Sequence, residues 1–330
     1  MTGFDFSSAE KPTFYFIGVT TSKSSIMKVF PEWMKYFNLG DIKIQGIDCK
    51  HHDDPEVYRK IVDFIKNDLN SIGGLVTTHK LDLLKAGKEM FDGLGPYAQL
   101  LEEISCISKR SGKLWGHAKD PITAGLSLEA FMPKGYWKQS SAEICLLGAG
   151  GSSLATTMYL MDNYKKDNTP SKIYVTNRSI PRLEGMEKIH KQINPGFNIE
   201  YIHCPVPENN DEVVSCLKPG SLVVNATGLG KDAPGSPITD AVKFPENGYV
   251  WEFNYRGDLV FLDQANVQKT VKNLFIEDGW TYFIHGWTRV IAEVFHINIP
   301  VSGPGFDRLS EIASINRTPG NEHIKKEIKL

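Results

Sequence analysis

Long apolar runs, a large net charge and CxxC cysteine pairs are all missing from this 330-residue chain. No apolar run reaches about 18 residues, the length that a membrane-spanning helix requires. Lysine and arginine number 37 against 39 aspartate and glutamate residues, so the net charge of −2 creates no basic field that would attract nucleic acid. The N-terminal segment is polar and carries Asp5, which is untypical of a signal or transit peptide. We therefore expect a cytoplasmic protein with neither a membrane nor a nucleic-acid partner.

Cysteine is scarce, and its spacing excludes two kinds of structure. No CxxC pair occurs among the five residues Cys49, Cys106, Cys145, Cys204 and Cys216. A disulfide framework and a zinc ribbon are therefore not expected, and the pattern fits a reducing compartment. Metal-ligand residue types stand in a row at 51–54, but consecutive residues rarely converge on one ion. We interpret that row as a loop and helix cap and predict no metal site.

The size of the chain predicts two domains, because single hydrophobic cores rarely exceed about 250–300 residues. Strand-like apolar segments alternate with helical ones, which predicts α/β domains built on parallel sheets. A helix is expected over 51–74, since Asp54-Pro55 is a start signal and Gly73-Gly74 a stop signal. In the first part of the chain, strands are expected over 14–19, 41–49 and 73–80.

The second part of the chain has the pattern of a dinucleotide-binding domain. Ser111-Gly112 predicts a hairpin turn, and a domain boundary is expected near residue 121. Beyond it, strands and helices alternate over about 150 residues, as in doubly wound folds. A glycine-rich turn, Gly148-Ala149-Gly150-Gly151-Ser152-Ser153, follows the apolar strand 144–147 and opens a helix. Glycines there allow a tight turn and a close backbone approach to a pyrophosphate, which the helix N-terminus favours.

The end of the next strand indicates which dinucleotide is bound. An acidic residue there would favour NAD, but the sequence is Thr176-Asn177-Arg178-Ser179, followed by Arg182. Both arginines match a 2′-phosphate, so NADP is the predicted cofactor, with NAD less favoured. The alternative is that both are solvated surface residues. The small residues Asn225-Ala226-Thr227 follow a later strand and suit the nicotinamide half of the cofactor.

Eight short segments occur in a recognisable order between residues 14 and 296: IGVTTSKSS, VTTHK, GHAKD, GAGGSS, TNRS, NATGLG, EFNY and HGWTRVIAEVF. In that order they resemble the motifs of the shikimate/quinate dehydrogenase family. The resemblance implies a catalytic pair, Lys80 and Asp120, which would exchange a proton with a ring hydroxyl during hydride transfer. Lys80 is expected at the C-terminal end of a buried strand, where parallel sheets place their ligands. Without the resemblance, an exposed surface salt bridge would be the default interpretation.

The same resemblance implies the remaining site residues. Substrate-binding positions would be Ser22, Ser24, Val76, Ser108, Tyr255 and Glu293. Cofactor-binding positions would be Gly148, Gly150, Gly151, Ser152, Asn177, Arg178, Ser179, Arg182, Asn225, Ala226, Thr227 and Gly286.

Several substrate positions depart from the family pattern. Val76 stands where the family has threonine, Ser108 where it has asparagine and Glu293 where it has glutamine. Lys109, Ala118, Lys119 and Arg289 are further departures. Such changes alter matched hydrogen bonds, so the substrate is expected to be 3-dehydroshikimate/shikimate, quinate or a close analogue. Glu293 suggests pairing with a cationic substituent of such an analogue.

We expect a substrate-binding catalytic domain of residues 1–120 and 285–330 and a Rossmann-type NADP-binding domain of residues 121–284. The expected cleft lies between them, with Lys80 and Asp120 facing the nicotinamide. The expected function is that of an NADP-dependent oxidoreductase acting on a small cyclic hydroxy acid, as a monomer or homodimer. Two alternatives remain: a dehydrogenase of the same fold that acts on a methylene-pterin, and a non-catalytic sensor of NADP or another ligand.

Overall fold

The computed structural model describes residues 6–163, 167–231 and 233–317. Within them the chain divides into two compact units. Unit 1 comprises the residues up to Thr123 and those from Ile284 onward, and unit 2 is Ala124–Phe283. The basic C-terminal segment beyond Arg317 belongs to the expected substrate domain and lies outside the described residues.

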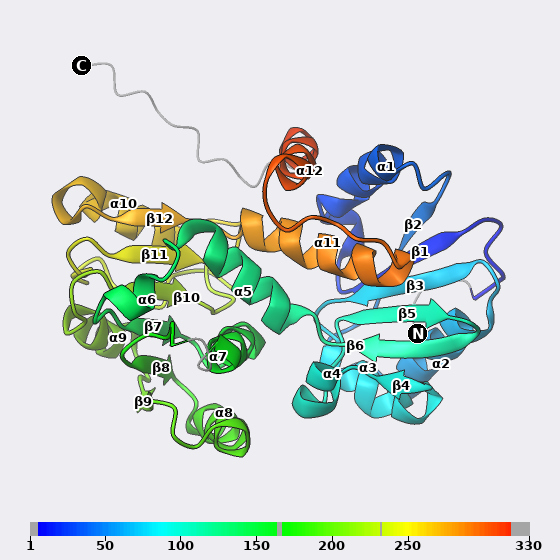
Figure 1. The fold of residues 1–330 in the computed structure, drawn as a ribbon. Helices are drawn as coiled ribbons and strands as arrows, with labels where there is room; N and C mark the ends of the chain where they lie inside the picture. Colours follow the sequence, from blue (N-terminus) through cyan, green and yellow to red (C-terminus); the bar gives the residue numbers. More distant parts are fainter. Residues whose placement is uncertain (1–5, 164–166, 232, 318–330) are drawn as a thin grey trace. The chain divides into compact units, whose positions relative to one another are not determined.

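Unit 1 contains a six-stranded sheet in the order β2-β1-β3-β5-β6-β4 (Figure 1). Strands β2, β1 and β3 are parallel, whereas β5 runs antiparallel to both of its neighbours. The sheet is therefore mixed: the expected parallel pairing holds for most of its strand pairs but not for those of β5. The cause is the β5–β6 hairpin, whose turn residues Ser111 and Gly112 both have positive φ angles. The strands are β1 Thr13–Gly18, β2 Lys43–Asp48, β3 Ser71–Val76, β4 Gly93–Leu94, β5 Cys106–Arg110 and β6 Lys113–His117.

Helices connect and cover these strands. The helical elements of the first part are η1 Thr21–Lys23, α1 Ile26–Phe37, α2 Pro55–Asn67, α3 Lys80–Gly87, η2 Lys88–Met90 and α4 Pro96–Leu101. Two helices, α5 Asp120–Phe131 and α11 Trp280–Phe295, carry the chain from one unit into the other, and α12 Pro304–Ile315 follows in unit 1.

The paired glycines of unit 1 do not end a helix as expected. Helix α2 begins at the predicted cap, where Asp54 accepts a hydrogen bond from the backbone of Glu56, but it ends at Asn67. Gly73 and Gly74 lie inside β3 instead. A Cβ on Gly73, which has φ +134°, would lie 2.3 Å from the carbonyl oxygen of Ile107 on β5. The glycines are required by close strand pairing, a tertiary constraint that a local stop signal does not reveal.

Unit 2 contains a parallel sheet in the order β12-β11-β10-β7-β8-β9 (Figure 1). This is the doubly wound order, which reverses direction between β10 and β7. The strands are β7 Ile144–Leu147, β8 Ile173–Asn177, β9 Ile199–His203, β10 Leu222–Asn225, β11 Tyr249–Glu252 and β12 Phe275–Glu277. The helices are α6 Tyr136–Gln139, α7 Gly151–Asn163, α8 Ile180–Ile193, α9 Pro207–Ser215 and α10 Val260–Lys272.

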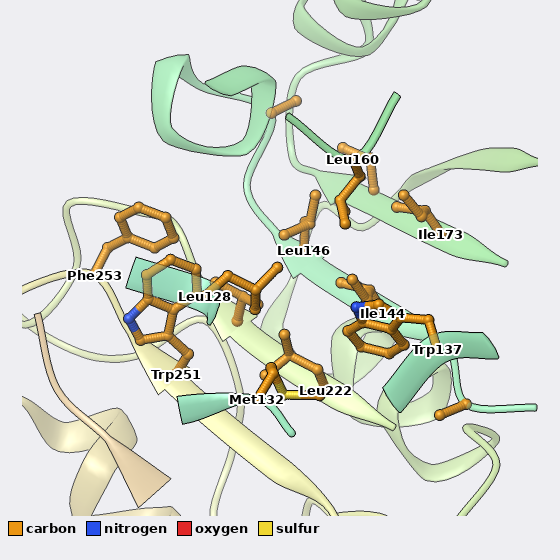
Figure 2. Packing of buried hydrophobic residues seen from close by; sticks show 14 of the residues in the cluster. Leu128, Met132, Trp137, Ile144, Leu146, Leu160, Ile173, Leu222, Trp251 and Phe253 are labelled. Carbon is orange, nitrogen blue, oxygen red and sulfur yellow. The ribbon is translucent and has the colours of Figure 1, made fainter. Parts of the chain in front are cut away.

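Two apolar clusters fill unit 2, one on each face of its sheet. Figure 2 shows the first, in which Trp251 and Phe253 lie beside Leu128, and Ile144 and Leu146 of β7 lie nearby. The second cluster contains Cys145 and Leu147, the alternate residues of the same strand. Because successive side chains of a strand point to opposite faces, β7 is buried on both sides, as a central parallel strand requires. The glycine-rich turn is thus anchored at the middle of the sheet.

The predicted α/β fold class is confirmed, including the Rossmann-type unit. In the described parts of the chain no helix has the length and apolar character needed to cross a membrane. In the same residues the side chains of histidine, cysteine, aspartate and glutamate form no cluster of three or more that could hold a metal ion.

Candidate active site

The two residues of the expected catalytic pair meet in unit 1. Lys80 is the first residue of α3 and Asp120 the first residue of α5, and the Nζ atom of Lys80 forms an ion pair with Oδ2 of Asp120. The side chains are only 25% and 14% exposed, so the pair is not the surface salt bridge that was the alternative. Strand β3 ends at Val76, four residues before Lys80, so the expectation that Lys80 lies at a strand end was wrong. It begins the helix that follows the strand.

A third charged residue, Glu103, faces the pair and was not found from the sequence. It follows α4, and its neighbour Ile104 donates a backbone hydrogen bond to the carbonyl oxygen of Lys80 at 3.3 Å. Burial raises the pKa of Glu103 to about 7; the Lys80 ammonium opposes this shift and Asp120 adds to it. The cluster therefore contains one cation and two carboxylates, one of which changes its charge near neutral pH.

The net effect on Lys80 follows from opposing contributions. Burial alone would lower its pKa, since a charged amine is poorly solvated in the protein interior. The charges of Asp120 and Glu103 and the hydrogen bond to Asp120 outweigh burial, so the pKa of Lys80 is raised. At neutral pH the residue is an ammonium, ready to donate a proton.

The serine-containing turn after β1 lies on the same sheet. Asp48, at the end of β2, accepts hydrogen bonds from the backbone nitrogen and the hydroxyl of Thr21 at 2.8 and 2.6 Å. These bonds fix the turn that presents Ser22 and Ser24, of which Ser22 is exposed and Ser24 buried. Because β1 and β3 are parallel neighbours, this turn and the segment leading to Lys80 leave the same edge of the sheet.

Three of the positions that depart from the family pattern, Ser108, Lys119 and Glu293, form a second polar cluster in unit 1. Glu293 of α11 pairs with Lys119 at 2.6 Å and contacts Nε2 of His117 at 3.3 Å. Ser108 contacts the same nitrogen at 3.1 Å. Burial raises the pKa of Glu293, but the hydrogen bond and charge of Lys119 lower it further, so that the net pKa is below its ordinary value. Glu293 is therefore an anion that the chain itself neutralises, which removes the basis for pairing it with a cationic substrate.

The other expected substrate positions are dispersed. Val76 is fully buried at the end of β3. Lys109 donates to the backbone oxygen of Asp68, and Arg289 to that of Ile299, so both cations have partners in the fold. Tyr255 lies in unit 2, where its ring packs against Trp280 and Phe283.

In unit 2 the glycine-rich turn joins β7 to α7 as expected. Gly148 adopts φ +110°, and a Cβ there would lie 3.0 Å from Thr227 and 3.1 Å from the carbonyl oxygen of Ala226. A Cβ on Gly150 or Gly151 would meet no atom within 4 Å, so open space lies beside the turn. Ser152 and the buried Ser153 follow in α7, and Ser153 bonds back to Gly148. The turn leaves room for a bulky group at the start of a 13-residue helix.

Strand β8, which is adjacent to β7, ends at Asn177, and the expected arginines follow it. Arg178 and Arg182 are exposed and form no ion pair with any of the described residues. Asn177 accepts a hydrogen bond from the backbone of Arg178, while its Nδ2 atom is buried without a partner in the described structure. Ser179 is the residue before α8. The arrangement leaves two exposed cations beside the end of β8, which suits a phosphate group. Gly286, the remaining cofactor position, lies in α11 within unit 1 near Thr123.

Curated proteins of known activity are similar to part of the chain. No family model matches it. Shikimate dehydrogenase (NADP(+)) of Streptococcus thermophilus is 30% identical over 167 residues, which cover 50% of this chain and 53% of that protein. The aligned part thus spans about half the length of this curated relative.

Solved structures resemble the chain over nearly its full length. Shikimate 5-dehydrogenase of Thermus thermophilus in complex with NADP(H) and shikimate has a TM-score of 0.66 at 19% identity, with 92% of this chain and 99% of that one covered. Quinate dehydrogenase of Corynebacterium glutamicum in complex with NAD has a TM-score of 0.70 at 17% identity, with 92% and 98% covered. At these identities the structural likeness shows a shared fold. The chain is thus similar to shikimate and quinate dehydrogenases, in agreement with the resemblance found in its motifs.

We expect the Glu103 carboxyl group to titrate near pH 7. In Lys80→Met its pKa should rise further, because that variant removes the cation that favours the ionised carboxylate. Carboxyl ¹³C chemical shifts measured against pH test this. Lys85→Met, which removes an exposed lysine of the same helix, serves as the control and should leave the titration unchanged. A Glu103 titration in the ordinary glutamate range would contradict the placement of this residue in the cluster.

Proposed function

We propose that the chain is an NADP-dependent oxidoreductase of the shikimate dehydrogenase type. It catalyses reversible hydride transfer between NADP(H) and a cyclic hydroxy or keto carboxylic acid such as shikimate, quinate or a close analogue. The observation that carries the proposal is the partly buried ion pair of Lys80 with Asp120. Unit 1 holds this acid–base pair and the substrate, and unit 2 binds the dinucleotide.

The proton chemistry in this proposal belongs to unit 1. The nicotinamide, when bound, supplies the hydride to the ketone carbon or accepts it from the alcohol. Lys80, as an ammonium, donates a proton to the carbonyl oxygen that becomes a hydroxyl, and it takes that proton back in the oxidation direction. Asp120 orients the ammonium. Because the pKa of Lys80 is raised, its neutral form is scarce near pH 7. Ketone reduction is therefore favoured at neutral pH, and oxidation should accelerate as the pH rises toward that pKa.

Three features of unit 2 support NADP as the cofactor. The pyrophosphate would lie at the N-terminus of α7, against Gly150, Gly151 and Ser152, where open space borders the turn. The 2′-phosphate would be held by Arg178 and Arg182, with Asn177 and Ser179 beside it. The structure of the Thermus thermophilus relative in complex with NADP(H) is consistent with this choice.

The substrate class follows from the polar groups of unit 1. Ser22 and Ser24 supply hydroxyl groups suited to a carboxylate, which favours a hydroxy acid over a methylene-pterin. Val76 offers no hydrogen bond, and Glu293 is bound by Lys119, so the site makes fewer free polar contacts than the family pattern implies. The Lys80–Asp120 pair argues against the sensor alternative, because a binding module has no need of a partly buried proton donor.

The reaction is tested by following NADPH absorbance with 3-dehydroshikimate, and NADP⁺ reduction with shikimate, quinate and aminated analogues. We expect turnover with a hydroxy acid of this set. Lys80→Met should lower kcat about 10²–10⁴-fold, the contribution typical of a general acid or base, and leave NADPH affinity nearly unchanged. Lys85→Met should behave as wild type. Unchanged activity of Lys80→Met would remove the residue from the mechanism, and firm NADPH binding without any turnover would favour the sensor.

The cofactor preference has its own test. Replacing Arg178 and Arg182 by glutamine should weaken NADPH binding about 10-fold or more, because a charge-assisted hydrogen bond to phosphate is lost, and leave NADH binding unchanged. Titration calorimetry with both nucleotides measures the ratio. Arg308→Gln, on α12 of unit 1, is the control variant. If the affinities for NADPH and NADH fell equally, neither arginine would bind the 2′-phosphate.

A further inference from the structure

A carboxylate with no cationic partner in the described structure is buried at the end of the central strands of unit 2. Glu252, the last residue of β11, is fully buried. It accepts hydrogen bonds from Nδ2 of Asn225 at 2.5 Å, from the backbone nitrogen of Asn254 at 2.8 Å and from Nδ2 of Asn254 at 2.7 Å. The charged residue that faces it, Asp278, has the same sign. Burying a carboxylate without a cation costs free energy of solvation, so packing alone does not account for a glutamate at this position.

The hydrogen bonds continue from Glu252 into the segment after β10. Oδ1 of Asn225 accepts from the backbone nitrogen and hydroxyl of Thr227 at 3.0 and 2.6 Å. The Thr227 hydroxyl in turn accepts from the backbone of Leu229 at 3.2 Å. Nδ2 of Asn254 also donates to the carbonyl oxygen of Thr227 at 3.2 Å. Residues 225–229, which we call the β10 loop, are thus held through the two asparagines that Glu252 orients.

The β10 loop borders the glycine-rich turn directly. Thr227 and the carbonyl oxygen of Ala226 approach the Cα of Gly148 so closely that a Cβ there would lie 3.0 and 3.1 Å from them. A displacement of the loop therefore changes the walls of the space beside the turn. Glu252 itself has no exposed surface through which it could contact a ligand.

We propose that Glu252 is a positioning residue of the dinucleotide site, which fixes the β10 loop against the glycine-rich turn by orienting Asn225 and Asn254. The assignment rests on the proposed function only in calling the site a dinucleotide site. A carboxylate suits this role because it only accepts hydrogen bonds, and all three of the groups that contact it are N–H donors. Burial raises the pKa of Glu252 to about 7, against the hydrogen bonds from Asn254 and Asn225 that lower it, with Asp278 adding to the rise.

The geometry allows a substitution and its rescue to be designed. In Glu252→Gln, the side-chain oxygen still accepts from Asn254, but the new amide nitrogen faces Nδ2 of Asn225, so that two donors oppose each other. Turning the Asn225 amide over would place its nitrogen against the Thr227 backbone N–H instead. In the double variant Glu252→Gln with Asn225→Asp, one oxygen of the introduced carboxylate accepts from the introduced amide and the other accepts from Thr227. The double variant therefore restores every hydrogen bond, with the carboxylate moved to the neighbouring strand.

The test is hydrogen exchange of the Thr227 and Leu229 amides in the full chain without ligand, with thermal unfolding measured alongside. In Glu252→Gln the protection factors of these amides should fall about 10- to 100-fold, as expected for losing a buried hydrogen bond to a charged group. The double variant should recover most of that loss. Protection that is unchanged in Glu252→Gln, or that the double variant fails to recover while it stays folded, would overturn the proposal. If Glu252→Gln does not fold, Glu252→Asp, which is one methylene shorter, replaces it and should show the same selective loss.

NADPH affinity, measured on the same proteins, separates this proposal from the proposed function. Weaker NADPH binding by Glu252→Gln and recovery in the double variant would support the positioning role. Equal NADPH binding by wild type and Glu252→Gln, despite a less protected loop, would overturn it. A wild type that binds no dinucleotide would contradict the proposed function instead, and the exchange data would then decide alone whether Glu252 fixes the loop.

Discussion

The ion pair between Lys80 and Asp120 is the interaction on which the chemistry of unit 1 depends. Each partner is the first residue of a helix, so the pair also sets where α3 and α5 begin relative to the sheet. A carboxylate is favoured at a helix N-terminus, but an ammonium is not, because the N-terminal end carries partial positive charge. Lys80 is thus stable in this position only because carboxylates surround it. The same carboxylates hold its proton, and this makes the residue a proton donor at neutral pH.

The carboxylates of the two proposed sites are compensated differently. In unit 1 cations neutralise the partly buried carboxylates of the site, as Lys80 does for Asp120 and Lys119 for Glu293. In unit 2 the Glu252 carboxylate is surrounded by asparagine and backbone N–H groups instead. The difference suits the proposed tasks. A proton-transfer site needs a charge that can move, whereas a loop beside a cofactor needs fixed hydrogen-bond geometry.

The sequence predicted best those features whose causes are local. The strand, glycine turn and helix around Gly148 were predicted because consecutive residues determine all three: an apolar run forms the strand, glycine allows the positive φ angle, and the helix begins directly after the turn. Gly73 and Gly74 were misinterpreted as a helix stop, because the strands that exclude a Cβ there are distant in the sequence. Ile107 of β5 excludes it at Gly73, and Tyr15 of β1 excludes it at Gly74. Lys80 was placed at a strand end by the same reasoning from local pattern, although the chain turns into a helix there.

Contacts between distant residues could not be predicted from the sequence. The Lys119–Glu293 pair joins residues 174 positions apart, so the substrate pairing suggested for Glu293 had no competitor at that stage. Glu103 lies in no motif, and only the fold brings it to Lys80. The one available signal was a pair of acidic residues, Glu102 and Glu103, between apolar residues just before a buried strand. Glu252 lies in the EFNY segment, which contributed only to the family resemblance. Its donors come from Asn225 at the end of β10 and from Asn254, two residues after β11.

The most direct test of this account is the ionisation of Lys80 in the folded protein, measured from the pH dependence of its ¹³Cε and ¹⁵Nζ chemical shifts. The account predicts that Lys80 stays an ammonium throughout the neutral range and titrates above the usual range for lysine, because Asp120 and Glu103 outweigh its burial. A Lys80 that loses its proton near pH 7 would contradict it, since burial would then dominate and the residue would act as a neutral base.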